Sequence, residues 1–384
     1  MSSLQVRAVR NRSQRRRFLR FPWQLYRDDA NWICPLRRTQ KELLGFRRHP
    51  FYDDAETQAF LATRAGRVCG RIAAVIHHAH NRRHRESRGF FGFFESENDP
   101  AVAEALFGAV RRWLAGRGIE QIRGPMNPGY NYEMGLLVDG FDSPPTFLMT
   151  YNPPYYPELV EACGFHQAKD LYAYSAHIDQ VGSIEKVVPT FVDEIVRQYG
   201  VTLRRLDPSR FDDDVKTFLE IYNVANVDQY GFVPLSAGEM RHMATGMRRL
   251  VVPELTSVAE IDGRPIGTVL GMLDYNPRIK TIDGRLFPTG FLRLLWNRRA
   301  IKRARMIATQ VLPEYQRGGL AIAMMARILP DFIDFGLEEC EFSWVMEDNV
   351  LSRRTIERSG GKLAKTYRLY EDTPAATARA SAST

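Results

Sequence analysis

The 384-residue sequence is poor in cysteine and contains no long apolar run. Its four cysteines are far apart in the chain, and their spacing excludes both a disulfide framework and a zinc motif. No stretch approaches the roughly eighteen consecutive apolar residues that a membrane-spanning helix needs. The basic N-terminus has no apolar signal core, so we expect no export signal. These absences predict a packed protein of the reducing cytoplasm.

Acidic residues are missing from two stretches of the chain. Residues 1–27 contain eight arginines and no acid, and residues 284–305 contain seven basic residues and no acid. The formal net charge of the whole chain is +8, so the remaining residues are net acidic. Positive charge that is concentrated in this way indicates anionic partners, which include phosphates, nucleic acid and a membrane surface.

Four histidines are clustered in an arginine-rich stretch, at His77, His78, His80 and His84. A metal site is conceivable, but the arginines of this stretch would repel a cation and no cysteine lies nearby. We therefore expect a solvated loop here and no metal ion in the protein.

The sequence also lacks the two common nucleotide loops, because no Gly-Lys-Ser/Thr and no Gly-x-Gly-x-x-Gly occurs at a strand-to-helix turn. In their place, a β-rich segment ends near Val311, Pro313 follows it, and Gly318-Gly319 open a helical run at Leu320. Such a turn leaves backbone N–H groups unpaired at a helix start, where they can hold a phosphate. A glycine pair alone is weak evidence of a phosphate site, so the residues around it must also be considered.

The length of the chain favours two domains, and the elements we expect repeat in two halves. The first half has a hairpin over residues 59–76, a strand over 89–94, a helix from Asp99-Pro100 and a strand over 119–123. The second half has a strand over 201–206, a helix over 212–224, a hairpin that turns at Asp262-Gly263, and strands over 307–312 and 342–345.

The glycine turn carries the pattern Gln-x-x-Gly-x-Ala, written here as Gln316, Gly319 and Ala321. It resembles the acyl-CoA pyrophosphate loop of the GNAT N-acyltransferases, and the strand and helix over 342–359 resemble the second half of their core. The resemblance implies an α/β fold of two GNAT units in tandem, each a mixed, splayed central sheet flanked by helices. It also implies that acyl-CoA is the co-substrate and that the following residues bind it: Gln310, Val311, Gln316, Arg317, Gly318, Gly319, Leu320, Ala321 and Asn349.

In the first half, residues 124–133 stand where this loop would be, but they offer proline, asparagine, tyrosine and a carboxylate. We therefore predict a GNAT-like domain without CoA binding over 1–180 and a linking helix over 181–200. A GNAT domain with the acyl-CoA site would cover 201–372, and a disordered tail 373–384.

Motifs along nearly the whole chain resemble the bacterial ceramide synthase family. They are Gly124-Pro125-Met126-Asn127-Pro128, Tyr151-Asn152-Pro153-Pro154-Tyr155-Tyr156, Gly231-Phe232-Val233-Pro234, Gly284-Arg285-Leu286-Phe287-Pro288 and Glu347-Asp348-Asn349. The resemblance implies transfer of a long-chain acyl group from acyl-CoA to the amine of a sphingoid base, either sphinganine or 3-ketosphinganine.

Ile356 occupies the position at which GNAT enzymes often carry a tyrosine acid. The candidates for the catalytic proton acceptor are instead Glu347, Glu133, Asp228 and Tyr230. Glu347 follows a strand expected to line the acyl-CoA cleft, although a carboxylate at a helix start also has a structural explanation. Glu133 could equally hold a loop, and Asp228 could cap a turn.

Residues 287–305 are aromatic and leucine-rich at the front and basic behind. They predict either an interfacial helix on anionic lipid, which implies peripheral contact with the inner membrane, or a core helix whose arginines pair elsewhere. Two alternative functions stay open. One is a GNAT enzyme acting on another amine, by acetyl or aminoacyl transfer, and the other is a nucleic-acid-binding regulator that uses the N-terminal arginines. The CoA loop favours the transferase, and we expect no nucleic-acid partner.

Overall fold

The computed structural model describes residues 3–180 and 188–372, and these residues form two compact units. Unit 1 comprises Met1–Leu171, Pro277–Gly290 and Lys365–Thr384, and unit 2 comprises Tyr172–Asn276 and Phe291–Ala364. The sequence prediction placed residues 277–290 and 365–372 in the C-terminal domain. The predicted disordered tail and the first seven residues of the predicted linking helix lie outside the described residues.

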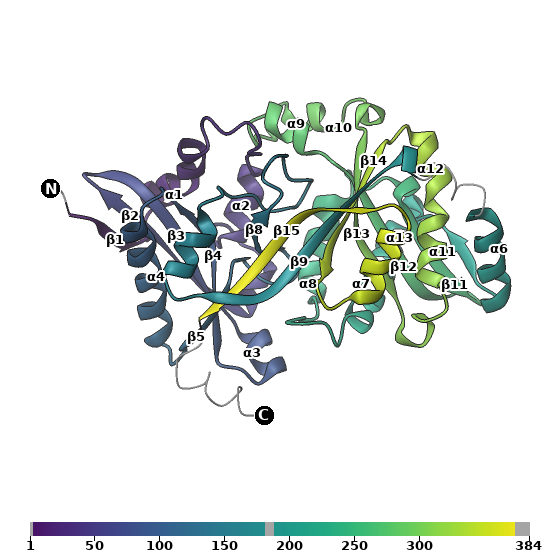
Figure 1. Cartoon of the computed structure of the whole chain (residues 1–384), viewed down its shortest axis with the longest axis horizontal. Coiled ribbons are helices and arrows are strands. Elements are labelled where there is room, and N and C mark those ends of the chain that lie inside the picture. The colour runs from purple at the N-terminus through teal and green to yellow at the C-terminus, as the bar shows by residue number, and fades with distance from the viewer. Residues whose placement is uncertain (1–2, 181–187, 373–384) are drawn as a thin grey trace. The chain divides into compact units, whose positions relative to one another are not determined.

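Unit 1 contains a mixed sheet with the strand order β1-β2-β3-β4-β5-β15, followed by the first part of β9, while β8 pairs with β15 (Figure 1). The strands are β1 (Gln5–Ala8), β2 (Ala55–Arg64), β3 (Arg67–His77), β4 (Arg88–Ser96), β5 (Gln121–Gly124), β6 (Met126–Asn127), β7 (Glu133–Met134), β8 (Leu136–Asp139), β9 (His166–His177) and β15 (Lys362–Asp372). Its helices are α1 (Arg12–Leu25), α2 (Arg37–Leu43), α3 (His78–His84), α4 (Pro100–Ala115), α5 (Tyr156–Ala162) and most of α9 (Asn276–Thr281).

The predicted hairpin and helix of the first half are confirmed. β2 and β3 pair from Ala55↔His77 to Arg64↔Arg67, which extends the expected hairpin at its open end. α4 begins as expected, because the Asp99 side chain accepts a hydrogen bond from the Ala101 backbone and Pro100 needs no partner for its missing N–H. The helix buries Leu106, Phe107 and Val110 completely against the sheet.

Unit 2 repeats this plan with the strand order β9-β14-β13-β12-β11-β10. The strands are the second part of β9, β10 (Thr202–Arg204), β11 (Thr256–Ile261), β12 (Arg264–Leu273), β13 (Arg303–Val311) and β14 (Glu339–Met346). The helices are α6 (Val188–Tyr199), α7 (Phe211–Ala225), α8 (Ala237–Met247), α10 (Gly290–Leu295), α11 (Leu320–Ala326), α12 (Ile328–Phe335) and α13 (Val350–Arg358). The predicted hairpin turn is confirmed, with Asp262 and Gly263 both at positive φ.

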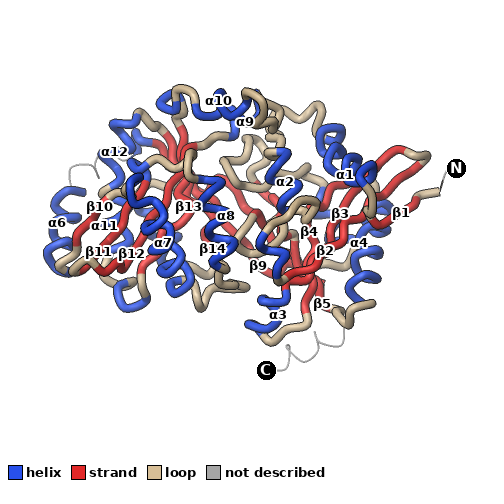
Figure 2. The backbone as a smooth tube through the Cα atoms, turned by 180° about the vertical axis from the view of Figure 1, so that it is seen from behind, coloured by secondary structure: helices blue, strands red, loops and turns tan. Residues whose placement is uncertain are grey.

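Helices cover both faces of the unit 2 sheet. α11 lies on one face, because a Cβ on Gly267 would come within 2.8 Å of the Met324 sulfur, and Arg327 just after α11 bonds to Ser257. α7 and α8 lie on the face of the sheet that is turned toward the viewer in Figure 2. Since successive side chains of a strand point to opposite faces, the residues next to Gly267 point toward the α7 side.

Two predictions about local structure are wrong. The histidine stretch is not a loop but helix α3, and His80 is 2% exposed and bonds to Glu86. The helix predicted within residues 287–305 is also wrong in extent, because α10 ends at Leu295 and β13 begins at Arg303. Among the described residues, no helix is long and apolar enough to cross a membrane, and no group of side chains could hold a metal ion.

Candidate active site

The central feature of unit 2 is the separation of two parallel strands. β13 and β14 pair over four positions, and the last pair is Met306↔Phe342. β13 nevertheless continues to Val311, still paired with β12, and β14 continues to Met346. A β-bulge at Ile307, between the pairs Gly271↔Met306 and Leu270↔Ala308, lies at the point of separation. The strands therefore open like a V toward their C-terminal ends.

The hydrogen-bond pattern of β13 shows which backbone groups face this opening. The Leu312 N–H donates to the Ile266 carbonyl at 2.9 Å, so Leu312 faces β12. In an antiparallel pair, alternate residues face the partner strand, so Gln310 also faces β12, while Thr309 and Val311 face away from it. The Val311 carbonyl accepts a bond from the Gln316 side chain at 3.0 Å. Of Gln310 and Val311, both predicted to bind acyl-CoA, Val311 is thus the residue whose N–H is directed toward the opening.

The glycine turn, which is the predicted cofactor turn, lies at the end of the sheet where β13 and β14 separate. A short 3-10 turn, Pro313–Tyr315, follows β13, and Gly319 caps α11 with a φ of +81°. An L-residue is strained in this conformation, which explains the glycine. A Cβ on Gly318 would fall 1.2 Å from the Tyr199 hydroxyl oxygen, so the turn packs closely under α6. Gln316 and Arg317 are exposed, whereas Leu320 is buried and anchors the helix.

Glu347 and Asn349 lie where β14 ends, beside the opening. Glu347 is half-buried, and its backbone carbonyl accepts a bond from the Arg353 side chain at 2.8 Å. The Asn349 side chain caps α13 by accepting a bond from the Ser352 amide at 3.1 Å. The structural role of Asn349 is therefore to cap the N-terminus of α13.

The other candidate proton acceptors lie outside the two strands that form the opening. Asp228 is exposed and Tyr230 half-buried, in the loop that follows α7. Because β10 runs opposite to β13 and α7 returns along the sheet, this loop reaches the end at which β13 and β14 separate. Glu133 belongs to unit 1, where it pairs with Asn127 between β6 and β7.

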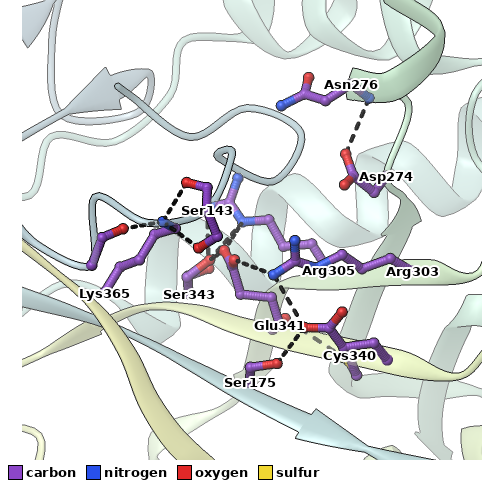
Figure 3. A network of polar contacts seen from close by, with 12 residues as sticks. Ser143, Ser175, Asp274, Asn276, Arg303, Arg305, Cys340, Glu341, Ser343 and Lys365 are labelled. Carbon is purple, nitrogen blue, oxygen red and sulfur yellow. Dashed lines mark hydrogen bonds and ion pairs between the residues drawn. The ribbon is translucent and has the colours of Figure 1, made fainter. Parts of the chain in front are cut away.

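A buried charged network, which the sequence analysis missed, lies at the base of the opening (Figure 3). Arg305 is 2% exposed and donates to the Ser343 hydroxyl at 2.8 Å, and that hydroxyl donates to Glu341 at 2.6 Å. Arg303 makes ion pairs with Glu339 at 3.2 Å and with Glu341 at 3.6 Å. The signal was present in the alternation Arg-x-Arg in one strand and Glu-x-Glu-x-Ser in its neighbour. The assignment of Arg303 and Arg305 to a basic surface segment is therefore wrong.

Unit 1 has the same opening, but its own chain fills it. β4 and β5 are parallel and their last pair is Phe90↔Arg123, with an irregularity of register between Arg71 and Ala73 of the neighbouring β3. The Phe93 amide donates to the Asn127 side chain at 2.7 Å. A Cβ on Gly92 would fall 1.9 Å from the Met126 carbonyl oxygen, which shows how tightly this segment is inserted. An asparagine oxygen thus takes the bond that a ligand carbonyl could take.

Comparisons with known proteins agree with this geometry. Residues 218–361 match the model of the acetyltransferase (GNAT) family. The tandem GNAT protein from the clavulanic acid biosynthesis pathway has a similar fold, with a TM-score of 0.56 at 10% identity over 96% of this chain and 98% of its own. The fold is therefore that of two GNAT units in tandem, as predicted, and the protein is an acyl-CoA-dependent N-acyltransferase.

Two curated relatives narrow the class. The chain is 38% identical to the bacterial ceramide synthase of Caulobacter vibrioides (strain NA1000 / CB15N), over 96% of this chain and 97% of that protein. It is 33% identical to Protein YghO of Escherichia coli (strain K12), over 95% and 94%. This chain belongs to the bacterial ceramide synthase family, as its motifs predicted.

Proposed function

We propose that this protein transfers a long-chain acyl group from acyl-CoA to the amine of a sphingoid base, sphinganine or 3-ketosphinganine, and so forms the ceramide amide bond. The observation that carries the proposal is the 38% identity to a bacterial ceramide synthase along almost the whole of both chains. The separated strands and glycine turn of unit 2 support it, because they suit a thioester that enters between two strands with its pyrophosphate at the turn.

The reaction forms one C–N bond and breaks one C–S bond. A neutral amine attacks the thioester carbonyl, the carbonyl oxygen becomes an oxyanion, and the thiolate of CoA leaves. An alkyl ammonium has a pKa of about 10.4, so it must lose a proton before attack. A thiolate leaves with little help near neutral pH. The protein must therefore supply an oxyanion donor and a proton acceptor.

We assign the oxyanion donor to the Val311 N–H, because it faces the opening and its strand neighbour Gln310 does not. The pyrophosphate then lies against the backbone of residues 316–321, with Gln316 holding the Val311 carbonyl in place. Glu347 is the strongest candidate for the proton acceptor, since it directly follows the second strand of the opening. Asp228 and Tyr230 are the alternatives from the facing loop.

The proposed membrane contact is restricted to residues around α10. Within unit 2, Leu292 is 57% and Trp296 is 78% exposed, and Arg293 and Arg299 are exposed beside them. These residues precede β13, whereas the cofactor turn follows it. The nine residues of β13 span about 26 Å at roughly 3.3 Å per step, so this surface would dock the protein at some distance from the reacting atoms.

Liposome flotation tests this contact. We expect binding to vesicles with anionic lipid that falls at least several-fold in a Leu292→Ser, Trp296→Ser double variant. A Val350→Ser, Leu351→Ser double variant serves as the control, because it removes two other exposed apolar residues, which are 46% and 68% exposed. Equal loss in both variants, or no binding by the unchanged protein, would overturn the assignment of α10.

The proposed reaction is tested by thiol release from the purified protein in detergent. Palmitoyl-CoA and acetyl-CoA are each supplied with and without sphinganine and 3-ketosphinganine. We expect release that requires both palmitoyl-CoA and a sphingoid base, together with an amide product by mass spectrometry. Release with acetyl-CoA and small amines alone would keep the enzyme class and refute the substrate.

A further inference from the structure

Three buried polar atoms of unit 2 have no hydrogen-bond partner within the described part of the chain: the hydroxyl oxygen of Thr268, the Nε of Arg303 and the indole nitrogen of Trp344. The Arg303 guanidinium is held by ion pairs with Glu339 and Glu341, so Thr268 and Trp344 are the two side chains whose polar group is wholly unpaired. Thr268 is 3% exposed, so water does not reach its side chain freely. An unpaired buried polar group reduces stability, and proteins keep few of them. Two such groups near one opening therefore suggest a ligand that completes their bonds.

Both atoms lie on the α7 side of the sheet. Thr268 is next to Gly267, whose Cβ position faces Met324 of α11, so the Thr268 side chain points to the opposite face. Its partner across the pair, Gln310, shares that face. Arg305 is opposite Met272 and thus also on this face, and its guanidinium lies 5.1 Å from the centre of the Trp344 ring.

Trp344 lies on one side of the opening, and Thr268 lies on the other side, one strand beyond β13. Thr268 is on β12, directly beside the end of β13 that carries the Val311 amide. Trp344 is on β14, two residues beyond the last pair with β13. The cofactor turn leads into α11 on the other face. An acceptor that reaches the same thioester from the α7 side would consequently pass between Thr268 and Trp344.

We propose that Thr268 and Trp344 form a subsite for the oxygen substituents of the acceptor, a long-chain amine with a hydroxyl or keto group on the carbon atoms next to the amine carbon. The indole N–H can only donate, so it needs an oxygen, and both a hydroxyl and a keto oxygen can accept. The threonine hydroxyl can donate or accept. This inference rests on the proposed function and extends it by naming the residues that select the acceptor.

The test measures selectivity instead of activity alone. Sphinganine is compared with octadecan-2-amine, which has the same chain length and a similarly placed amine without either hydroxyl, at saturating palmitoyl-CoA. We expect the unchanged protein to favour sphinganine in kcat/KM. Thr268→Val and Trp344→Phe should each reduce that preference about tenfold, with kcat/KM for octadecan-2-amine unchanged. Thr268→Ser should retain the preference, because it retains the hydroxyl.

Thr256 provides the matched control. It is a buried threonine on the same face, but its hydroxyl is bonded to the Leu206 amide and the Pro253 carbonyl. Thr256→Val should lower the melting temperature and leave selectivity unchanged. Thr268→Val should instead raise the melting temperature, because it removes an unpaired hydroxyl.

The outcomes separate the subsite from the proposed function. If the unchanged protein acylates sphinganine but Thr268→Val and Trp344→Phe lower kcat/KM equally for both amines, the subsite is refuted and the function stands. If the unchanged protein acylates neither amine, the proposed function fails. A thermal shift with sphinganine that is lost in Thr268→Val would then still support the subsite, and an unchanged shift would refute it.

Discussion

The position of one asparagine differs between the openings of the two units. In unit 1, Asn127 accepts a hydrogen bond from the Phe93 amide within the opening between β4 and β5. In unit 2, the amide directed into the opening is that of Val311, and no such side chain follows β14 there, since Asn349 caps α13 instead. A single asparagine thus takes the place of a ligand in unit 1, whereas Asn349 in unit 2 caps the start of a helix.

At the same scale, the proton acceptor can be identified by removing one charge. We expect Glu347→Gln to lower kcat about 100-fold or more, because a positioned base contributes roughly that factor. KM for acyl-CoA should change little, since the amide preserves the shape of the side chain. Asp228→Asn is the matched variant in the facing loop. A kcat loss confined to Asp228→Asn would move the role to that loop.

A buried histidine in unit 1 should make stability depend on pH. Burial lowers the pKa of His77 to about 4, below its ordinary value of 6.5. Between pH 6.5 and 4, His77 is therefore largely protonated in the unfolded chain and largely neutral in the folded chain. The corresponding stability is complete above pH 6.5 and is lost as the pH falls toward 4, by up to about 3 kcal/mol.

Chemical denaturation at a series of pH values measures this effect. The free energy of unfolding of the unchanged protein, relative to that of His77→Gln, should fall between pH 6.5 and 4. His166→Gln is the control, because the His166 side chain is 56% exposed. Parallel pH profiles for the unchanged protein and His77→Gln would contradict the burial argument.

At the scale of elements, the turn between β13 and α11 combines two demands on the chain. The strand must end with its amide facing the opening, and the helix must begin with its free N–H groups at the same end. Gly319 serves the second demand, because it directly precedes α11 with a φ of +81°, a conformation that glycine adopts without strain. Pro313 stops the strand and cannot extend the ladder.

Replacement of this glycine should separate stability from cofactor binding. Gly319→Ala places a Cβ at positive φ, which costs about 1–2 kcal/mol or moves the turn. Gly66→Ala places one at a φ of +75° in the β2–β3 hairpin, where nothing lies within 4 Å of the new atom. Both variants should lose similar stability, but only Gly319→Ala should raise KM for acyl-CoA, by about tenfold. Equal KM values would show that the turn does not hold the cofactor.

At the scale of the whole molecule, one architectural plan occurs twice with different outcomes. Each unit has an antiparallel run of strands, a bulge and a parallel pair that opens. In unit 1, residues that follow β5 fill the opening. In unit 2, the glycine turn lies at the end of the sheet where the strands open. We propose that only unit 2 binds the acyl donor.

Equilibrium titration with CoA measures the number of sites. We expect one CoA per chain, and Gly319→Ala should weaken that single site. Asn127→Ala, which removes the oxygen bonded to Phe93, should leave the stoichiometry at one because the backbone of Met126 still fills the opening. Two sites of comparable affinity in the unchanged protein would refute the division of roles.

The sequence alone determined the elements that rest on local chemistry. Asp99-Pro100 predicted the start of α4, Asp262-Gly263 predicted a hairpin turn, and Gln316 to Ala321 predicted the strand-turn-helix of a GNAT unit. Capping and turn formation depend on neighbours in the chain, so a short stretch of sequence contains the information. The family motifs also lie in contiguous runs, and for that reason they could be recognised without a structure.

Tertiary structure decided what depends on residues far apart in the chain. Arg303 and Arg305 looked like part of a basic surface until strand pairing placed them opposite Glu339 and Glu341. Residues 303–305 are not part of the helix predicted within 287–305, because they pair with β12 and β14. The direction of the Val311 amide and the unpaired Thr268 hydroxyl follow from the register between β12 and β13. Register is a property of two strands, so neither strand's sequence specifies it alone.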